Sequence, residues 1–141
     1  MENMRAAIEA AKRSGKDLPV GAVIVKDGKI IASAYNEKEL QNDVSAHAEI
    51  VAIRKASEVL GNWRLDGCEM YVTLEPCPMC AWAIMQSRIS KLYFGAYDNL
   101  YGGFSVLPDL KQIANSSLEV KGGICEEECA NLLKEYFKGV R

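Results

Sequence analysis

Four residues of this chain are of types and spacings that could bind and use a metal ion. His47, the only histidine, comes two residues before Glu49, and Cys77 comes three residues before Cys80. One imidazole and two thiolates supply three of the four tetrahedral ligands of zinc, and a catalytic zinc site leaves the fourth position open for water. We therefore predict that His47, Cys77 and Cys80 bind one Zn²⁺ per chain. We predict that Glu49 moves the protons of the activated water.

Each half of this constellation has other interpretations when taken alone. A single histidine is more often a hydrogen-bonded core residue, and a Cys-x-x-Cys pair also serves thiol redox chemistry. A redox pair would normally follow the first strand of its domain, whereas Cys77 and Cys80 follow three expected strands. A structural zinc site would need a second pair, for which only Cys125 and Cys129 are available. Cys129 belongs to an apolar helical stripe, which favours a place in the core.

The composition is that of a soluble globular protein. The 141 residues suffice for a single domain, 1–141, with 49% apolar and 26% charged residues. No apolar run approaches the roughly 18 residues of a membrane span, and the charged amino-terminal segment does not resemble a signal peptide. Five cysteines without a secretory context favour a reducing cytoplasm. The net charge of −2 gives no support to a nucleic-acid partner.

The hydrophobic periodicity predicts helices and strands that alternate along the chain. Asp27-Gly28 between two β-branched runs indicates a type I′ hairpin turn, Pro76 ends a strand, and Pro78 suits the first turn of a helix. Residues 36–44 should form a polar loop, with Ser45 or its neighbour capping the next helix. The pattern predicts an α/β protein with a mixed sheet and helices on both faces. The expected helices are 2–14, 46–60, 78–87, 108–114 and 126–138, and the expected strands are 20–26, 29–35, 68–74, 91–96 and 118–121.

The candidate zinc ligands fall at the starts of two of these helices. Cys77 and Cys80 lie in the first turn of one helix, where residues three apart share a face, and His47 lies in the first turn of another. The amino terminus of a helix stabilises thiolate and offsets negative charge. The ligands therefore come from adjacent strand-to-helix junctions, where α/β sheets commonly carry their sites.

The motif H-x-E followed by P-C-x-x-C is typical of zinc deaminases that act on nucleobases. Beyond this motif, the chain resembles the bacterial tRNA-specific adenosine deaminases of the cytidine deaminase-like superfamily over nearly its whole length. The zinc motif indicates deamination across the superfamily, and the longer set is more specific, with guanine deaminases as the closest competitor. The matching segments are Pro19-Val20-Gly21-Ala22-Val23, Tyr35-Asn36, Ala46-His47-Ala48-Glu49-Ile50, Asn62-Trp63-Arg64-Leu65, 71–81, Ser87-Arg88-Ile89 and Phe94-Gly95-Ala96-Tyr97-Asp98.

This resemblance implies a three-layer α/β/α cytidine deaminase-like fold with a five-stranded mixed sheet, and a homodimer. It implies hydrolysis of adenosine to inosine at the wobble position of a tRNA anticodon. In that reaction the imidazole and the two thiolates would hold zinc, and water would attack C6 of a flipped-out adenine. Glu49 would protonate N1, and ammonia would leave.

The resemblance also implies contacts to the substrate. Asn36 matches an asparagine that holds the target nucleoside, and Asp98 matches an aspartate that contacts a ribose 2′-hydroxyl, which favours RNA over DNA. Each of the two also suits a simple turn position. An aromatic and basic carboxyl-terminal end would grip the anticodon loop by stacking on unpaired bases, unless its helix only packs these aromatics. Backbone groups facing the base would come from Val20, Gly21, Ala22 and Ala48, and carboxyl-terminal contacts from Tyr136, Phe137, Lys138 and Arg141.

The chain departs from the family pattern at surfaces that should meet RNA or a second subunit. Trp82 stands where the family usually has glycine, the 99–104 loop lacks the usual lysine, and 115–117 lacks the usual histidine and arginine. With the acidic net charge, these departures keep a free nucleobase or nucleoside deaminase, of guanine, cytosine or cytidine type, as the alternative function. A non-catalytic zinc-binding interaction protein is a third possibility, against which the intact Glu49 argues.

Overall fold

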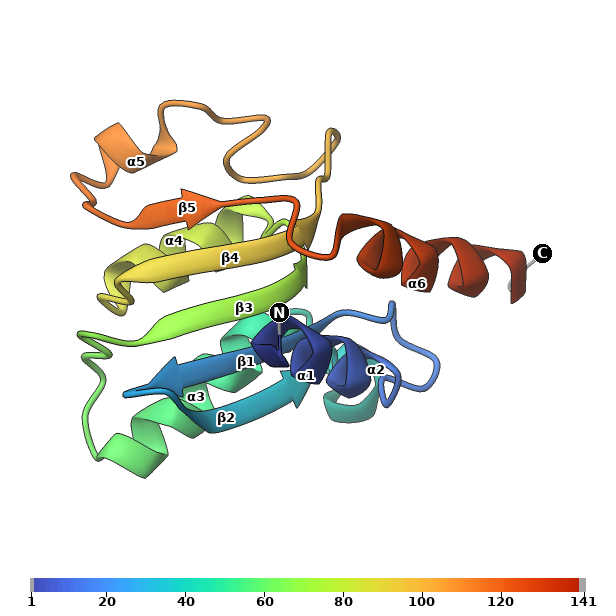
Figure 1. Ribbon diagram of the computed structural model, residues 1–141, viewed down its shortest axis with the longest axis horizontal. Helices are drawn as coiled ribbons and strands as arrows, with labels where there is room; N and C mark the ends of the chain where they lie inside the picture. The colour runs from blue at the N-terminus through green and yellow to red at the C-terminus, as the bar shows by residue number, and fades with distance from the viewer. Residues whose placement is uncertain (1, 140–141) are drawn as a thin grey trace.

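The computed structural model describes residues 2–139, and a mixed sheet lies at its centre (Figure 1). β1 is antiparallel to both β2 and β3, whereas β3, β4 and β5 run parallel. The carboxyl ends of the parallel strands therefore open on the same edge of the sheet. The strands are β1 (Gly21–Lys26), β2 (Lys29–Tyr35), β3 (Glu69–Leu74), β4 (Lys91–Ala96) and β5 (Glu119–Lys121), in the spatial order β2-β1-β3-β4-β5.

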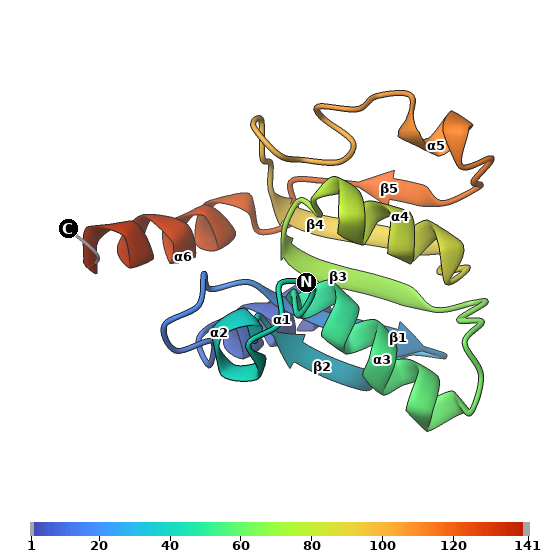
Figure 2. The same cartoon turned by 180° about the vertical axis from the view of Figure 1, so that it is seen from behind.

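Helices cover both faces of this sheet. α3 (Ala48–Leu60) and α4 (Pro78–Gln86) pack on one face, and α1 (Glu2–Ala11) and α6 (Glu126–Gly139) pack on the other (Figures 1 and 2). The short α5 (Leu110–Ile113) adds Leu110 to the core under α3 and α4. The predicted three-layer α/β/α arrangement is thus confirmed. No helix within residues 2–139 has both the length and the apolar character needed to cross a membrane.

Two features shape the β1–β2 hairpin, which forms one edge of the sheet. Asp27 and Gly28 have φ angles of 51° and 77°, the left-handed values that the predicted type I′ turn requires. Gly21, the first residue of β1, lies so close to α1 that a Cβ atom there would be 2.5 Å from the Ala11 nitrogen and would overlap the Ala7 carbonyl oxygen. Only glycine therefore allows α1 to lie directly against this strand.

Most element boundaries fall within two residues of the expected ones, with two differences. The first helix ends at Ala11 and does not continue to residue 14. The expected polar loop at 36–44 contains a short helix, α2 (Lys38–Gln41). Its first turn is held because the buried carboxylate of Asp17 accepts hydrogen bonds from the Glu39 amide at 3.1 and 3.3 Å. This long-range contact overrides the polar local sequence.

Candidate active site

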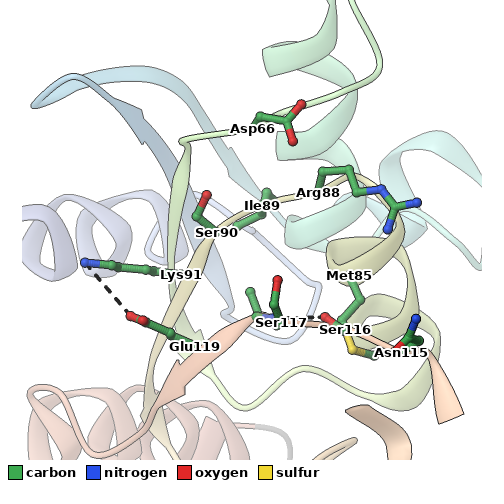
Figure 3. Close-up of a pocket in the computed structure, with 11 residues that line it drawn as sticks. Asp66, Met85, Arg88, Ile89, Ser90, Lys91, Asn115, Ser116, Ser117 and Glu119 are labelled. Carbon is green, nitrogen blue, oxygen red and sulfur yellow. Dashed lines mark hydrogen bonds and ion pairs between the residues drawn. The ribbon is translucent and has the colours of Figure 1, made fainter. Parts of the chain in front are cut away.

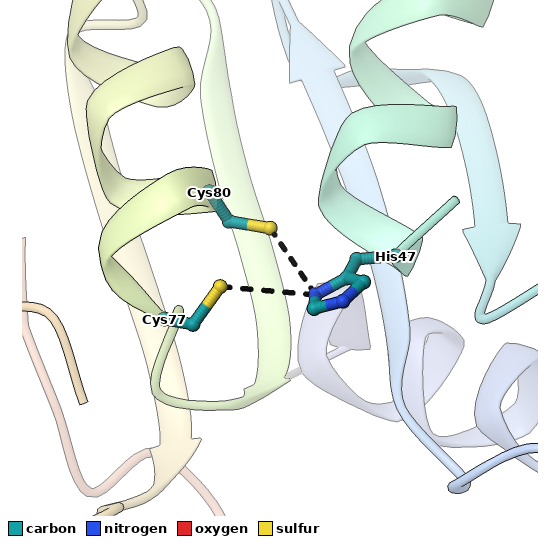
Figure 4. A group of neighbouring side chains, drawn as sticks. All are labelled: His47, Cys77 and Cys80. Carbon is teal, nitrogen blue, oxygen red and sulfur yellow. Dashed lines mark hydrogen bonds between the residues drawn. The ribbon is translucent and has the colours of Figure 1, made fainter. Parts of the chain in front are cut away.

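The three predicted zinc ligands lie at the amino ends of two neighbouring helices (Figure 4). His47 is the N-cap residue of α3; Ser45, the expected cap, instead donates its hydroxyl to the preceding loop. Cys77 is the N-cap residue of α4, with Pro78 at its first position and Cys80 in its first turn. Neither N-cap side chain makes a capping hydrogen bond. Both side chains are therefore available to the space between α3 and α4.

The donor atoms lie at the separations that one zinc ion requires. Nδ1 of His47 is 3.8 Å from Sγ of Cys77 and 3.5 Å from Sγ of Cys80. Tetrahedral bonds of about 2.3 Å to sulfur and about 2.05 Å to nitrogen place such atoms about 3.6 Å apart. Within residues 2–139, no other group of His, Cys, Asp and Glu side chains is gathered in this way. The donor set and its spacing fit a single zinc ion.

The structure contradicts a four-cysteine structural zinc site. The ligand group contains neither Cys125 nor Cys129. Cys129 is 1% exposed and packs in the core between the sheet and the α1 and α6 layer, as predicted. The described residues include all five cysteines, and no disulfide joins any two of them. The metal chemistry is therefore confined to the ends of α3 and α4.

The two thiols of the site differ in pKa. Hydrogen bonding from the Cys80 thiol, helped by His47, lowers the pKa of Cys77 to about 4. The bond to Cys77 and burial raise the pKa of the Cys80 thiol, and the contact with Cys77 also raises the pKa of His47. Since a coordinating thiol is deprotonated outright, a bound divalent cation would instead lower the pKa of Cys80. Cys77 would thus offer a thiolate to the cation, and Cys80 would lose its proton when it coordinates.

Glu49 lies in the first turn of α3, beside the ligands. Its side chain is 4% exposed and lines the same cavity as His47 and Cys77. Burial, which disfavours the charged form, raises the pKa of this carboxyl to about 7. A carboxyl with such a pKa exchanges protons readily near neutral pH. This suits a residue that takes a proton and later returns it.

A cavity of about 300 Å³ contains these groups. Three of the residues predicted to contact substrate line it, namely Val20, Asn36 and Asp98. Sequence reasoning missed several others, of which Glu75 had a visible signal: a carboxylate between an apolar strand and the proline that precedes the first cysteine. The unpredicted lining residues are Leu18, Leu74, Glu75, Pro78 and Tyr101.

Sequence and structure comparisons identify the family. Residues 1–96 match the cytidine and deoxycytidylate deaminase zinc-binding region. The tRNA-specific adenosine deaminase of Bacillus subtilis (strain 168) is 44% identical over 142 residues, covering 98% of this chain and 88% of that protein. A structure from studies of A-to-I editing by tRNA:A34 deaminases at the wobble position of transfer RNA superposes with a TM-score of 0.89 and 43% identity. It covers 94% of this chain and 99% of that one. The chain belongs to the tRNA-specific adenosine deaminase family.

A second structural relative, a guanine deaminase, superposes with only part of this chain. The guanine deaminase of Bacillus subtilis is 44% identical, but it superposes with a TM-score of 0.66 over 68% of this chain and 63% of that one. Family membership makes the present chain a zinc-dependent hydrolytic deaminase.

In the deaminase, Asn36 is fixed by two hydrogen bonds. Its amide nitrogen donates to the Leu18 carbonyl at 3.0 Å, and its amide oxygen accepts from the Ala48 nitrogen at 2.7 Å. The side chain therefore enters the cavity in one orientation, with one N–H and one lone pair left for a ligand. The Ala48 N–H, which was predicted to contact the base, donates to the Asn36 side chain in this structure.

Gly21 and Ala22 belong to the sheet and are not among the residues that line the cavity. The Gly21 nitrogen donates to the hydroxyl oxygen of Thr73 at 3.2 Å. Ala22 lies opposite Ala34 on β2 and Val72 on β3. Of the predicted segment, only Val20, just before β1 begins, reaches the cavity. Contacts of Gly21 and Ala22 with a bound base stay a prediction.

The carboxyl-terminal aromatic residues lie on α6, which extends past the edge of the sheet (Figure 1). The Tyr136 hydroxyl donates to the Lys16 carbonyl at 3.0 Å. The Phe137 ring is 53% exposed and meets the Tyr136 ring edge-on, with 5.3 Å between centroids. Neither residue lines the cavity. Arg141 lies outside the described residues.

A second cavity, of about 320 Å³, opens at the opposite end of the sheet, where β4 and β5 begin (Figure 3). Its lining is rich in polar groups, including Arg88 and Ser116, and Lys91 forms a 4.0 Å ion pair with Glu119 there. It contains no histidine or cysteine. This cavity therefore offers no site for the metal chemistry of the family.

Proposed function

We propose that this enzyme hydrolyses adenosine to inosine at the wobble position of a tRNA anticodon. The observation that carries the reaction type is the convergence of His47, Cys77 and Cys80 beside the buried Glu49. The relatives described above support the substrate, since this chain and the tRNA:A34 deaminase structure superpose over almost their full lengths. A single catalytic domain, 1–141, carries out the reaction.

The reaction adds water and releases ammonia. A zinc ion held by the imidazole and the two thiolates would activate the water that attacks the ring carbon bearing the amino group. Glu49 accepts a proton from this water and donates it to the adjacent ring nitrogen. It then passes the second proton of the water to the amino group, which leaves as ammonia, while the oxygen stays on the ring. The burial of Glu49 supplies the near-neutral pKa that both transfers need.

The cavity orients the nucleoside through a few polar groups among apolar walls. Leu18, Val20 and Leu74 provide apolar surface for a flipped-out base. Asn36, fixed by its two internal hydrogen bonds, binds the nucleoside with its remaining N–H and lone pair. Asp98 lines the mouth and contacts a ribose 2′-hydroxyl of the RNA.

A hollow beside the cavity offers two cations that suit RNA, although the chain has a net charge of −2. This hollow of about 340 Å³ is lined by Arg13 and Lys16, by the acidic Asp17 and Glu39, and by Asn36, which also lines the catalytic cavity. Tyr136 is bonded to the Lys16 carbonyl, so α6 borders the same hollow. The two cations contact phosphates of the anticodon loop, and the exposed Phe137 ring offers a stacking surface.

The enzyme acts as a homodimer in the cytoplasm. Met79 and Trp82, three residues apart on α4, are each 41% exposed, and the neighbouring loop exposes Leu100 and Tyr101. Such an apolar patch on a family member that matches its relatives over nearly full length suits a second copy of the chain. Five cysteines without a disulfide agree with a reducing compartment.

A substrate comparison tests the proposal. Zinc-loaded enzyme is incubated with an anticodon stem-loop carrying adenosine at the wobble position, and separately with free adenosine, guanine and cytidine. We expect inosine in the stem-loop and no ammonia from the free compounds. A stem-loop with adenosine only at a neighbouring position serves as the matched control. Ammonia from guanine or cytidine with an unchanged stem-loop would instead establish the free-base alternative.

A further inference from the structure

Glu75 is a buried carboxylate whose hydrogen bonds all go to one loop. It follows the last residue of β3 and is 2% exposed. Oε1 accepts from the Asp98 nitrogen at 3.0 Å and the Ser105 hydroxyl at 2.7 Å. Oε2 accepts from the Phe104 nitrogen at 3.2 Å and the Ser105 nitrogen at 2.7 Å. Both ends of the 98–105 loop are therefore fastened to the same side chain.

The loop is shaped to fit around this carboxylate. A Cβ atom at Gly102 would lie 2.5 Å from Oε1 of Glu75 and would overlap the Asp98 carbonyl oxygen. The next amide, that of Gly103, donates to the Pro76 carbonyl at 2.7 Å. Glycine at these positions lets the backbone approach Glu75 and Pro76 closely.

The 98–105 loop contributes two residues to the lining of the catalytic cavity. Asp98 and Tyr101 both line it. Oδ1 of Asp98 accepts from the nitrogens of Leu100 and Tyr101 at 3.0 and 2.9 Å, so the loop turns on this residue. Glu75 is two residues before the ligand Cys77, and its backbone nitrogen donates to the Ala96 carbonyl of β4 at 2.8 Å. One short segment thus sets the positions of a zinc ligand and of the cavity mouth.

We propose that Glu75 is a positioning residue that holds the 98–105 loop at the mouth of the active cavity and thereby sets the affinity for the RNA substrate. This inference rests on the proposed function for its substrate. The Glu75 carboxylate accepts four hydrogen bonds, all from the loop. It therefore influences the substrate indirectly, through the positions of Asp98 and Tyr101. Glu49 alone carries the proton transfers.

The test uses Glu75→Gln in the full-length zinc-loaded enzyme. The amide group of glutamine turns one acceptor into a donor that faces two other donors, so two of the four bonds are lost. Hydrogen–deuterium exchange of the Asp98, Phe104 and Ser105 amides should accelerate by about tenfold or more. KM for the stem-loop should rise by about tenfold, and kcat should stay within about twofold, because only binding is weakened. Zinc content should not change.

Three further substitutions serve as controls for this result. Ser105→Ala removes the hydroxyl bond alone and should give a smaller change in exchange and KM in the same direction. Glu119→Gln changes an exposed carboxylate at the opposite end of the sheet and should leave both unchanged. In a double-mutant cycle with Asp98→Ala, the effect of Glu75→Gln on KM should largely disappear, because both act on the same loop.

Several outcomes would overturn the proposal. Unchanged exchange of the three amides in Glu75→Gln would show that the loop is not held by this residue. Faster exchange with an unchanged KM would separate the loop from substrate affinity. Loss of zinc, or a fall in kcat as large as the rise in KM, would assign Glu75 to the metal centre. A zinc-loaded wild type that leaves the stem-loop unmodified refutes the proposed function and the substrate half of this inference, while the exchange data still decide whether Glu75 holds the loop.

Discussion

Replacing Glu49 by glutamine should strongly reduce turnover while zinc remains bound. The carboxyl is not part of the ligand group of His47, Cys77 and Cys80, so the ion keeps its three protein ligands. Glutamine has the same size but cannot accept and return a proton. The loss of general acid–base catalysis should lower kcat by about 10²–10⁴-fold.

The same substitution should stabilise the zinc-free protein above neutral pH. In the unfolded chain the carboxyl ionises near its ordinary pKa of 4.5, whereas burial raises the folded-state pKa to about 7. Between these values the folded state holds more protons than the unfolded state, so the free energy of unfolding falls as pH rises. At about 1.4 kcal/mol per tenfold change in proton affinity, the wild type loses roughly 3 kcal/mol by pH 8. Glutamine cannot ionise and avoids this loss.

The assay is thermal unfolding of chelator-treated wild type and Glu49→Gln at pH 5 and pH 8. The variant should unfold roughly 5–10 °C higher than the wild type at pH 8, with a smaller difference at pH 5. Glu58→Gln, at an exposed position of the same helix, is the matched control and should shift neither curve. Equal unfolding temperatures at pH 8 would show that folding does not raise the pKa of Glu49. Substantial residual turnover of the zinc-loaded variant would give the proton transfers to another group.

Three further predictions follow from single contacts. Gly21→Ala forces a Cβ atom onto the Ala7 carbonyl and the Ala11 nitrogen and should lower the free energy of unfolding in urea by about 1–3 kcal/mol; an unchanged midpoint would mean that α1 moves without cost. Metal analysis should find one zinc per chain in a Cys125→Ser, Cys129→Ala double variant and none in Cys77→Ser, and the reverse pattern would restore the structural-zinc interpretation. Trp82→Glu puts a charge on the exposed apolar face of α4 and should convert the dimer to monomers in sedimentation velocity, whereas a monomeric wild type would refute the proposed dimer.

The parts of the fold that short-range rules determine were predictable from the sequence. The positive φ angles at Asp27 and Gly28 follow from the residues themselves, and Pro76 and Pro78 separate β3 from α4 because proline lacks the amide proton. α2 could not be predicted in this way. Its first turn depends on the carboxylate of Asp17, which precedes β1 in the sequence, whereas α2 follows β2.

The same distinction separates the metal ligands from the rest of the site. Zinc accepts few ligand types at fixed spacings, so His47, Cys77 and Cys80 could be predicted from their pattern. The predicted backbone contact at Ala48 could not be judged by pattern, because whether its N–H is free depends on the amide of Asn36. Glu75 is the converse case, a residue inside a recognised motif whose partners lie more than twenty residues away. Sequence spacing therefore locates the metal ligands, while long-range hydrogen bonds set the orientation of the residues around them. Variation in the 98–105 loop should accordingly change the choice of substrate without changing the reaction.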